Sequence, residues 1–262
     1  MTMFLHEMKQ STKMLIIWNV LVGAIIVVCM ATFPEVKKQT DELREAFAMM
    51  GAFTSAFGLD KIDMMEAIGY YGLDCAAVLA FGGGLFAAFV GVRMLSKEET
   101  EHTAEFLLTH PLKRSSIIAG KFAAVVAQVI LFNLFCTVCA IASFALIGEE
   151  IPWKTFWIFQ LAQFLMHLEI GCISFGVSAL LKRGSAGFGL GFAALLYFLN
   201  VVANISDKWE FMRYITPYAY ADPSSVIPHA AITGEYLAIG MVYALIGVVF
   251  AFVWYSRKDI TP

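Results

Sequence analysis

Apolar residues occur in six long runs along this chain, and a polar or charged segment separates each run from the next. A helix needs roughly 20 apolar residues to cross about 30 Å of hydrocarbon, and each run is long enough. The third run is longer than one span requires, so we expect that helix to tilt or to extend into water. The predicted spans cover residues 15–33, 73–94, 117–147, 155–181, 185–204 and 236–255.

Composition agrees with a membrane location. The chain is 60% hydrophobic and 15% charged, whereas soluble domains are about 45–50% apolar and roughly 25% charged. Neither an internal repeat nor a low-complexity segment is visible, and the connections leave no room for a soluble domain. We therefore predict one all-α transmembrane domain over residues 1–262, a six-helix bundle without a nucleic-acid partner.

Residues 1–14 have the pattern of a short amphipathic helix. Phe4, Leu5 and Met8 recur at helical spacing, and charged residues lie elsewhere on the wheel. This favours an interfacial elbow helix before the first span. The alternative is the basic region of a cleaved signal peptide, but the next apolar run is too long and lacks a small-residue cleavage site.

The distribution of Lys and Arg predicts the orientation. One set of connections holds eleven of the 18 basic residues, close to the helix ends, and the other holds seven. Cytoplasmic loops carry the excess of Lys and Arg. We therefore expect a multi-pass protein of the cell membrane, with both termini and residues 93–121 in the cytoplasm, and residues 35–72 and 205–235 outside.

The two external segments differ in character. Residues 35–72 are acidic and partly helical in pattern, which suits either a solvated cap or a substrate vestibule. Residues 205–235 contain three prolines that forbid one long helix, so we predict short re-entrant-like helices on or in the outer leaflet. Its aromatic residues suit the membrane interface; they are Trp209, Phe211, Tyr214, Tyr218 and Tyr220.

Glycines occur in two groups within the spans. Glycine weakens a helix by about 1 kcal/mol relative to alanine, but it allows helices to approach closely. We predict helix packing at both groups, with a hinge or substrate path as the alternative for the first. The first group is Gly82, Gly83 and Gly84, and the second is Gly184, Gly187 and Gly191.

The fourth predicted span carries the candidate substrate pathway. Gln160, Gln163 and His167 share one helix face, and Glu169 lies well around the wheel. Polar residues at membrane depth face the protein interior or a wet cavity. A pathway or subunit-facing role and a structural hydrogen bond both remain open. His167 and Glu169 are not expected to form a metal site. Two residues apart on a helix, they point about 200° away from each other, and no third ligand is evident.

Motifs for independent chemistry are missing from the sequence. It lacks the G-x-x-x-x-G-K-[ST] loop that cradles nucleotide phosphates, and it lacks H-E-x-x-H and G-x-S-x-G. The five cysteines lie in or beside apolar runs, as buried structural thiols do. The chain is therefore expected to bind no cofactor of its own and to have no catalytic residues.

Residues 93–121 form the long charged interruption between the second and third spans. Phe106, Leu107 and Leu108 would form an apolar ridge on a short helix that ends at Pro111. An apolar ridge with charged shoulders suits a partner groove. The alternative is a solvated loop whose apolar residues fold back on the bundle.

The sequence of this segment resembles the E-x-x-x-G-T-x-E-x-L-L-x-x-P-x-x-R…GK signature of the ABC-2 type transporter permeases, with His102 in place of the usual glycine. The resemblance implies a type V exporter-like permease whose coupling helix docks on a separate subunit that binds ATP and Mg. It also implies a second permease copy, as a homodimer or heterodimer, in membrane lipid. The implied docking residues are Glu98, Glu99, Thr103, Glu105, Phe106, Leu107, Leu108, Pro111 and Arg114.

Two other functions stay open on the sequence. One is a self-contained ion-coupled transporter or channel that uses Asp74, His167 and Glu169. The other is an intramembrane hydrolase that uses His167 and Glu169. The resemblance allows drug-like compounds, antimicrobial peptides, lipids, polysaccharides or ions as substrates. The apolar bundle and its aromatic outer segments favour an amphipathic or lipid-like one.

Overall fold

The computed structural model describes residues 2–39, 54, 56–59, 61–100, 113–181 and 186–258, and these residues form helices and loops without a strand. Six of the described helices are long and apolar enough to cross a membrane, which confirms the predicted all-α fold. They are α1 (Thr2–Lys38), α5 (Ala76–Met94), α8 (Arg114–Ile147), α9 (Trp153–Ser178), α10 (Ala186–Ile205) and α12 (Gly234–Arg257). Shorter elements are α4 (Ala67–Tyr70), the π-helical η1 (Tyr71–Cys75), α6 (Lys97–Thr100), the 3₁₀ helices η2 (Asp207–Tyr214) and η3 (Pro217–Ala221), and α11 (Pro223–Val226).

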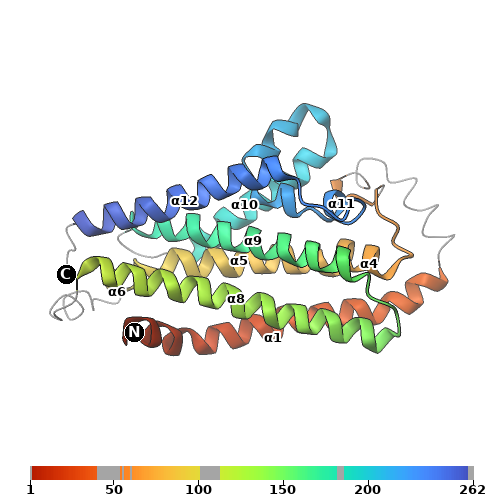
Figure 1. Ribbon diagram of the computed structural model, residues 1–262, viewed down its shortest axis with the longest axis horizontal. Coiled ribbons are helices and arrows are strands. Elements are labelled where there is room, and N and C mark those ends of the chain that lie inside the picture. Colours follow the sequence, from red (N-terminus) through yellow and green to blue (C-terminus); the bar gives the residue numbers. More distant parts are fainter. Residues whose placement is uncertain are drawn as a thin grey trace.

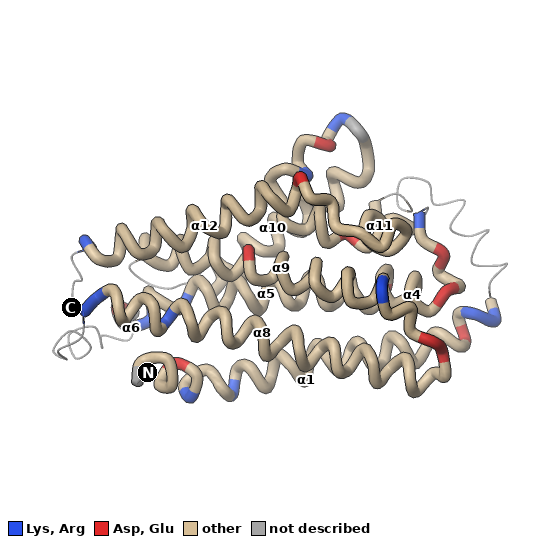
Figure 2. The backbone as a smooth tube through the Cα atoms, in the orientation of Figure 1, with Lys and Arg blue, Asp and Glu red and all other residues tan. Residues whose placement is uncertain are grey.

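The long helices lie side by side along the longest axis of the molecule (Figure 1). Helix α5 packs on α9 and α10, α1 packs on α8, and α12 packs on α9. Most of α5 and α9 is buried inside the chain, whereas little of α12 is. Both termini and α6 lie at one end of the bundle, here called the terminal end, and α4 and α11 lie near the other, here called the loop end. Charged residues gather at these two ends (Figure 2).

Glycines allow the central helices to cross at short range. A Cβ atom on Gly91 of α5 would lie 2.6 Å from the Gly171 carbonyl oxygen of α9. A Cβ on Gly176 of α9 would lie 2.6 Å from the Gly247 oxygen of α12. Close backbone approach of this kind is typical of helices packed through small residues in membranes, so these residues place α9 at the centre of the bundle.

The predicted glycine groups fall at different places. A Cβ on Gly82 would lie 3.0 Å from Val22, while Gly83 and Gly84 meet the His167 ring and the Tyr218 hydroxyl. On α10, Gly187 is exposed, and no atom of the described residues lies within 4 Å of a Cβ placed on Gly191, so the described helices of this chain do not supply the predicted packing partner of Gly191. Its neighbour Gly189 instead lies against Val92 and the Ala88 oxygen of α5. Gly184 lies outside the described residues.

The first helix differs from its prediction at both ends. Residues of the predicted elbow continue into the span without a break, so the amphipathic segment is not a separate helix. The helix also passes through Pro34, where the sequence suggested an end, and stops at Lys38. A proline lacks the N–H that would donate to the carbonyl four residues earlier. Close to the end of a helix this loss leaves only a short segment beyond the break. Beyond Pro34, the Lys37 ammonium pairs with Glu149 at 2.6 Å.

The second span begins six residues earlier than predicted, because α4 and η1 continue into α5 as one segment from Ala67 to Met94. Tyr70 and Tyr71 are buried in this added part. Asp74 therefore lies inside the π-helical turn, where it accepts a hydrogen bond from the Tyr70 hydroxyl at 2.8 Å, rather than at the start of the helix.

Residues 205–235 form the predicted series of short helices. Ser206, Thr216 and Asp222 cap η2, η3 and α11 with side-chain oxygens. Trp209, Phe211 and Tyr214 are exposed, as expected for interface residues. Tyr218 and Tyr220 are buried, however, so their assignment to the interface is wrong. Sequence composition could not distinguish the two sets because burial depends on how η3 enters the bundle.

Candidate functional site

The described flanks of the predicted coupling segment lie at the terminal end. Residues 101–112 lie outside the described residues, as does the side chain of Glu98. The site is therefore built from α6 on one flank and from the start of α8 on the other. The predicted docking residues that fall outside the description are Thr103, Glu105, Phe106, Leu107, Leu108 and Pro111.

Glu7 of α1 binds both flanks of the segment. Its carboxylate is fully buried. Lys97 of α6 forms an ion pair with it and also donates to the Gln10 side chain. On the other flank, Lys121 of α8 donates to Glu7 Oε1 at 3.0 Å and to the Met94 carbonyl oxygen at 2.7 Å. One carboxylate therefore joins the entry and the exit of the predicted coupling loop.

The Gly-Lys pair of the sequence signature has a structural role at this point. A Cβ on Gly120 would lie 3.1 Å from the Met3 Cβ and 3.5 Å from the Phe4 nitrogen. The glycine thus lets the first turns of α1 approach α8. Lys121 is completely buried and can reach Glu7 because of that approach. The sequence analysis did not predict a role for Glu7. The available signal was that Glu7 is the one acidic residue in the amphipathic segment 1–14.

A second set of contacts joins the same flanks to the C-terminal helices. The Glu99 carboxylate pairs with the Lys258 ammonium at 2.9 Å, and both side chains are largely buried. Lys258 also donates to the Leu181 oxygen at 3.1 Å, beyond the end of α9. Arg114 donates to the carbonyl oxygens of Lys258 at 2.8 Å and Ser256 at 3.4 Å. Of the predicted docking residues, Glu99 and Arg114 therefore hold the flanks to α12.

These contacts connect the loop flanks mechanically to the bundle. A buried ion pair contributes little net stability, but breaking one costs much because a charge is left uncompensated. The flanks are therefore constrained to a small number of positions relative to α1, α8 and α12.

The four candidate pathway residues of α9 lie in the interior of the bundle. All are buried. Gln160 donates to the Tyr71 hydroxyl at 3.2 Å, and Gln163 donates to the Ala221 oxygen at 2.9 Å. His167 Nδ1 lies 3.0 Å from Asn133 Oδ1, and Glu169 accepts from the Tyr220 hydroxyl at 2.8 Å. Within this chain they join α9 to η1, η3 and α8.

The structure does not bring Asp74, His167 and Glu169 together. Asp74 is exposed and bonds Tyr70, whereas the other two are buried with separate partners. Across the described ranges, no group of three His, Cys, Asp or Glu side chains is arranged to hold a metal. All five cysteines are free thiols, buried or half-buried. Neither the ion-coupled nor the hydrolytic alternative finds a convergent site in the part of the chain that is described.

Six apolar helices, packed through glycines and charged at their two ends, define a multi-pass α-helical membrane protein. Residues 1–260 match the family described as ABC-2 family transporter protein, and the chain belongs to that family. It is accordingly a membrane permease of an ABC transporter. No curated protein matches its sequence.

Proposed function

We propose that this chain is the permease subunit of an ATP-driven exporter, and that a separate ATP-binding subunit docks on residues 93–121. ATP and Mg belong to that partner. The observation that supports this most directly is that Glu7 forms two ion pairs, one with Lys97 before the loop and one with Lys121 after it. A simple connection between two spans has no need for such a constraint.

The contacts suggest how nucleotide-driven motion would reach the membrane. A partner that moves the apolar ridge at Phe106–Leu108 would displace both flanks of the loop together. Lys121 and Lys97 would pass the displacement to α1 through Glu7, and Glu99 would pass it to α12 through Lys258. The same load would reach α9 through the Leu181 carbonyl.

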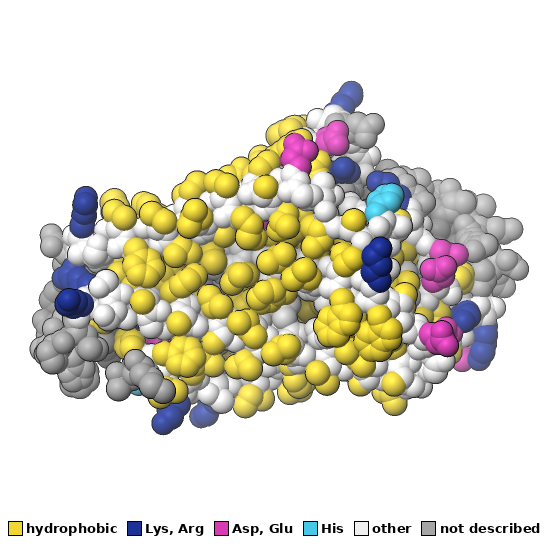
Figure 3. Space-filling view, viewed as in Figure 1, with side chains coloured by type: hydrophobic (Ala, Val, Ile, Leu, Met, Phe, Trp, Pro, Cys, Tyr) yellow, Lys and Arg dark blue, Asp and Glu magenta, His cyan; other side chains and the backbone are white. Residues whose placement is uncertain are grey.

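The outer surface of the bundle supports the rest of the proposal. Apolar side chains cover the face shown in Figure 3, between charged ends. On α8 and α12 large apolar residues such as Leu134, Val138 and Leu245 are exposed. Lipid and a second permease copy would cover this surface, and an amphipathic or lipid-like substrate would move between or along the two permeases. Both termini lie at the end that we place in the cytoplasm.

The experiment is co-expression with a candidate ATP-binding subunit, followed by co-purification and an ATPase assay. Phe106→Glu and Leu107→Pro are expected to abolish co-purification, because one buries a charge and the other breaks the docking helix. The matched control is Phe211→Glu, at the exposed η2 on the opposite end. Co-purification that survives both loop substitutions would refute docking. Gradient-driven transport by this chain alone in liposomes without ATP would refute the ATP-driven function.

A further inference from the structure

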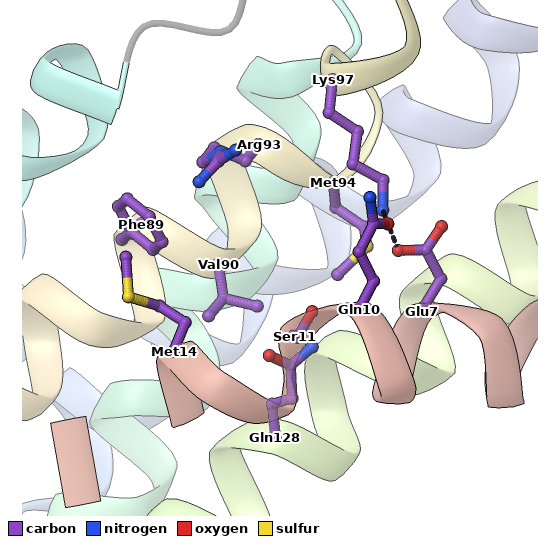
Figure 4. A pocket seen from close by; sticks show the side chains of 10 residues that line it. All are labelled: Glu7, Gln10, Ser11, Met14, Phe89, Val90, Arg93, Met94, Lys97 and Gln128. Atoms are coloured by element: carbon purple, nitrogen blue, oxygen red, sulfur yellow. Dashed lines mark hydrogen bonds and ion pairs between the residues drawn. The ribbon is translucent and has the colours of Figure 1, made fainter. Parts of the chain in front are cut away.

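A cavity of about 100 Å³ lies between α1 and α5 at the terminal end. Figure 4 shows side chains of α1 facing those of α5 across it, with Lys97 at one side. None of the predicted pathway residues lines it. The side chains that line it are Glu7, Gln10, Ser11, Met14, Phe89, Val90, Arg93, Met94, Lys97 and Gln128.

The lining is divided by depth. Arg93 lies in the last turn of α5, and Lys97 follows that helix, so both lie at the level where a membrane span ends. Met14 and Phe89 lie further toward the middle of their helices. Cations and amides at the helix end over apolar side chains at greater depth suit an amphipathic ligand, because each of its parts finds a matching environment.

Polar groups also reach the cavity from inside the bundle. Gln128 of α8 is 1% exposed and borders the cavity, and its amide nitrogen donates to the Ala124 oxygen of its own helix at 3.2 Å. Gln10 and Ser11 add an amide and a hydroxyl from α1. The one carboxylate in the lining, Glu7, is paired with Lys97 and Lys121 and so repels an anion less than a free carboxylate would.

We propose that this cavity binds the phosphate group of an anionic phospholipid. Arg93 and Lys97 would hold the phosphate by charge-assisted hydrogen bonds, and Gln10 and Ser11 would hydrogen-bond its ester or headgroup oxygens. The acyl chains would run from the opening past Met14 and Phe89 into the bilayer. Free inorganic phosphate would make the same charged contacts but none of the apolar ones. Comparing the two ligands therefore distinguishes a lipid site from a phosphate site.

The location gives the lipid a role beyond solvation. Lys97 belongs both to the cavity and to the pair with Glu7, so a phosphate at this site would contact the entry flank of the coupling loop. A bound lipid would also bridge α1 and α5, and would stabilise the folded state by mass action. The proposal does not depend on the identity of the ATP-binding subunit or on the substrate.

The test uses the full chain, purified in a neutral detergent and supplied with phosphatidylglycerol, phosphatidylcholine or inorganic phosphate. Thermal unfolding and native mass spectrometry report stabilisation and retained lipid. Phosphatidylglycerol is expected to raise Tm by roughly 5 °C at saturation. Arg93→Gln removes a cation from the cavity, and Ser11→Leu fills part of it. Arg257→Gln is the control, an exposed arginine at the same end of the bundle and outside the cavity.

The proposal predicts a shift with phosphatidylglycerol in the parent and in Arg257→Gln, reduced by at least half in Arg93→Gln and Ser11→Leu, with matching loss of bound lipid. An equal shift with phosphatidylcholine would overturn it, as would a full shift in both cavity variants. The same shift from inorganic phosphate alone would overturn the lipid assignment. Because Ser11→Leu changes no charge, it keeps the test informative if Arg93→Gln fails to fold.

Discussion

Lys121 and Glu7 lie 114 positions apart in the sequence, and their charged groups are 3.0 Å apart with both side chains fully buried. The lysine belongs to the signature of the predicted coupling segment, whereas the glutamate belongs to the first turns of the chain. Their contact makes the N-terminal helix part of the structure around the loop. It also explains how a basic residue can be buried beside an apolar span.

Lys121→Met is expected to destabilise the permease by about 1–3 kcal/mol, because Glu7 Oε1 and the Met94 oxygen lose their buried donor, while Lys97 still compensates the Glu7 charge. Thermal unfolding in detergent would show a lower Tm. Lys9→Met is the matched control on exposed α1 surface, with an expected change within about 0.5 kcal/mol.

Adding Glu7→Gln to Lys121→Met should cost less than the sum of the two single losses, since the contact between these two side chains can be lost only once. A double-mutant cycle measures this coupling. Strictly additive losses for the two substitutions would contradict a direct interaction between the side chains.

Gly91→Ala should destabilise the crossing of α5 and α9. The added Cβ would meet the Gly171 oxygen at 2.6 Å and the Phe175 nitrogen at 3.0 Å, both of which are backbone atoms that cannot turn away. Overpacking typically costs about 1–3 kcal/mol. Unfolding in a denaturant series would measure the loss.

Gly191→Ala is the control for that substitution, because no atom in the described part of the chain lies within 4 Å of the added Cβ. Alanine favours a helix over glycine by about 1 kcal/mol, so this variant should be unchanged or slightly more stable in the monomer. Equal losses at positions 91 and 191 would show that glycine flexibility, rather than the crossing, determines the effect.

Tyr220→Phe should loosen the segment between α10 and α12. The Tyr220 hydroxyl donates to Glu169 Oε2 at 2.8 Å, and among the described residues the buried Glu169 Oε1 has no hydrogen-bond partner. Loss of this donor removes the one hydrogen bond that the described residues give the carboxyl group, at a cost of about 1–3 kcal/mol. Limited proteolysis and Tm would both report it. Tyr243→Phe, on exposed α12 surface, should leave both unchanged.

The orientation predicts opposite labelling of the two ends. Lys154→Cys at the start of α9 and Arg257→Cys at the end of α12 are both exposed. In intact cells a membrane-impermeant maleimide should label Lys154→Cys alone, and Arg257→Cys should react only after permeabilisation. The parent chain, whose five thiols are buried or half-buried, supplies the background. The reverse pattern would place the termini outside.

The spans were predictable because long apolar runs report burial in hydrocarbon independently of their neighbours. Their ends were less predictable. Residues Ala67–Tyr70 join the second span because Tyr70 and Tyr71 pack inside the bundle. Similarly, α1 continues past Pro34, where Lys37 finds Glu149. Such extensions depend on contacts with residues far away in the sequence.

The sequence by itself determined that the chain is a six-span helical membrane protein, and its loop signature indicated the transporter family. Hydropathy and short motifs are local properties of the sequence, so they can be recognised without knowing which helices lie next to each other. The tertiary structure alone decided that Glu7 holds both flanks of the loop, that Gly189 rather than Gly191 packs on α5, and that Tyr220 is buried against Glu169. Each of these depends on which helix lies opposite, and helical periodicity specifies a face but does not specify its neighbour.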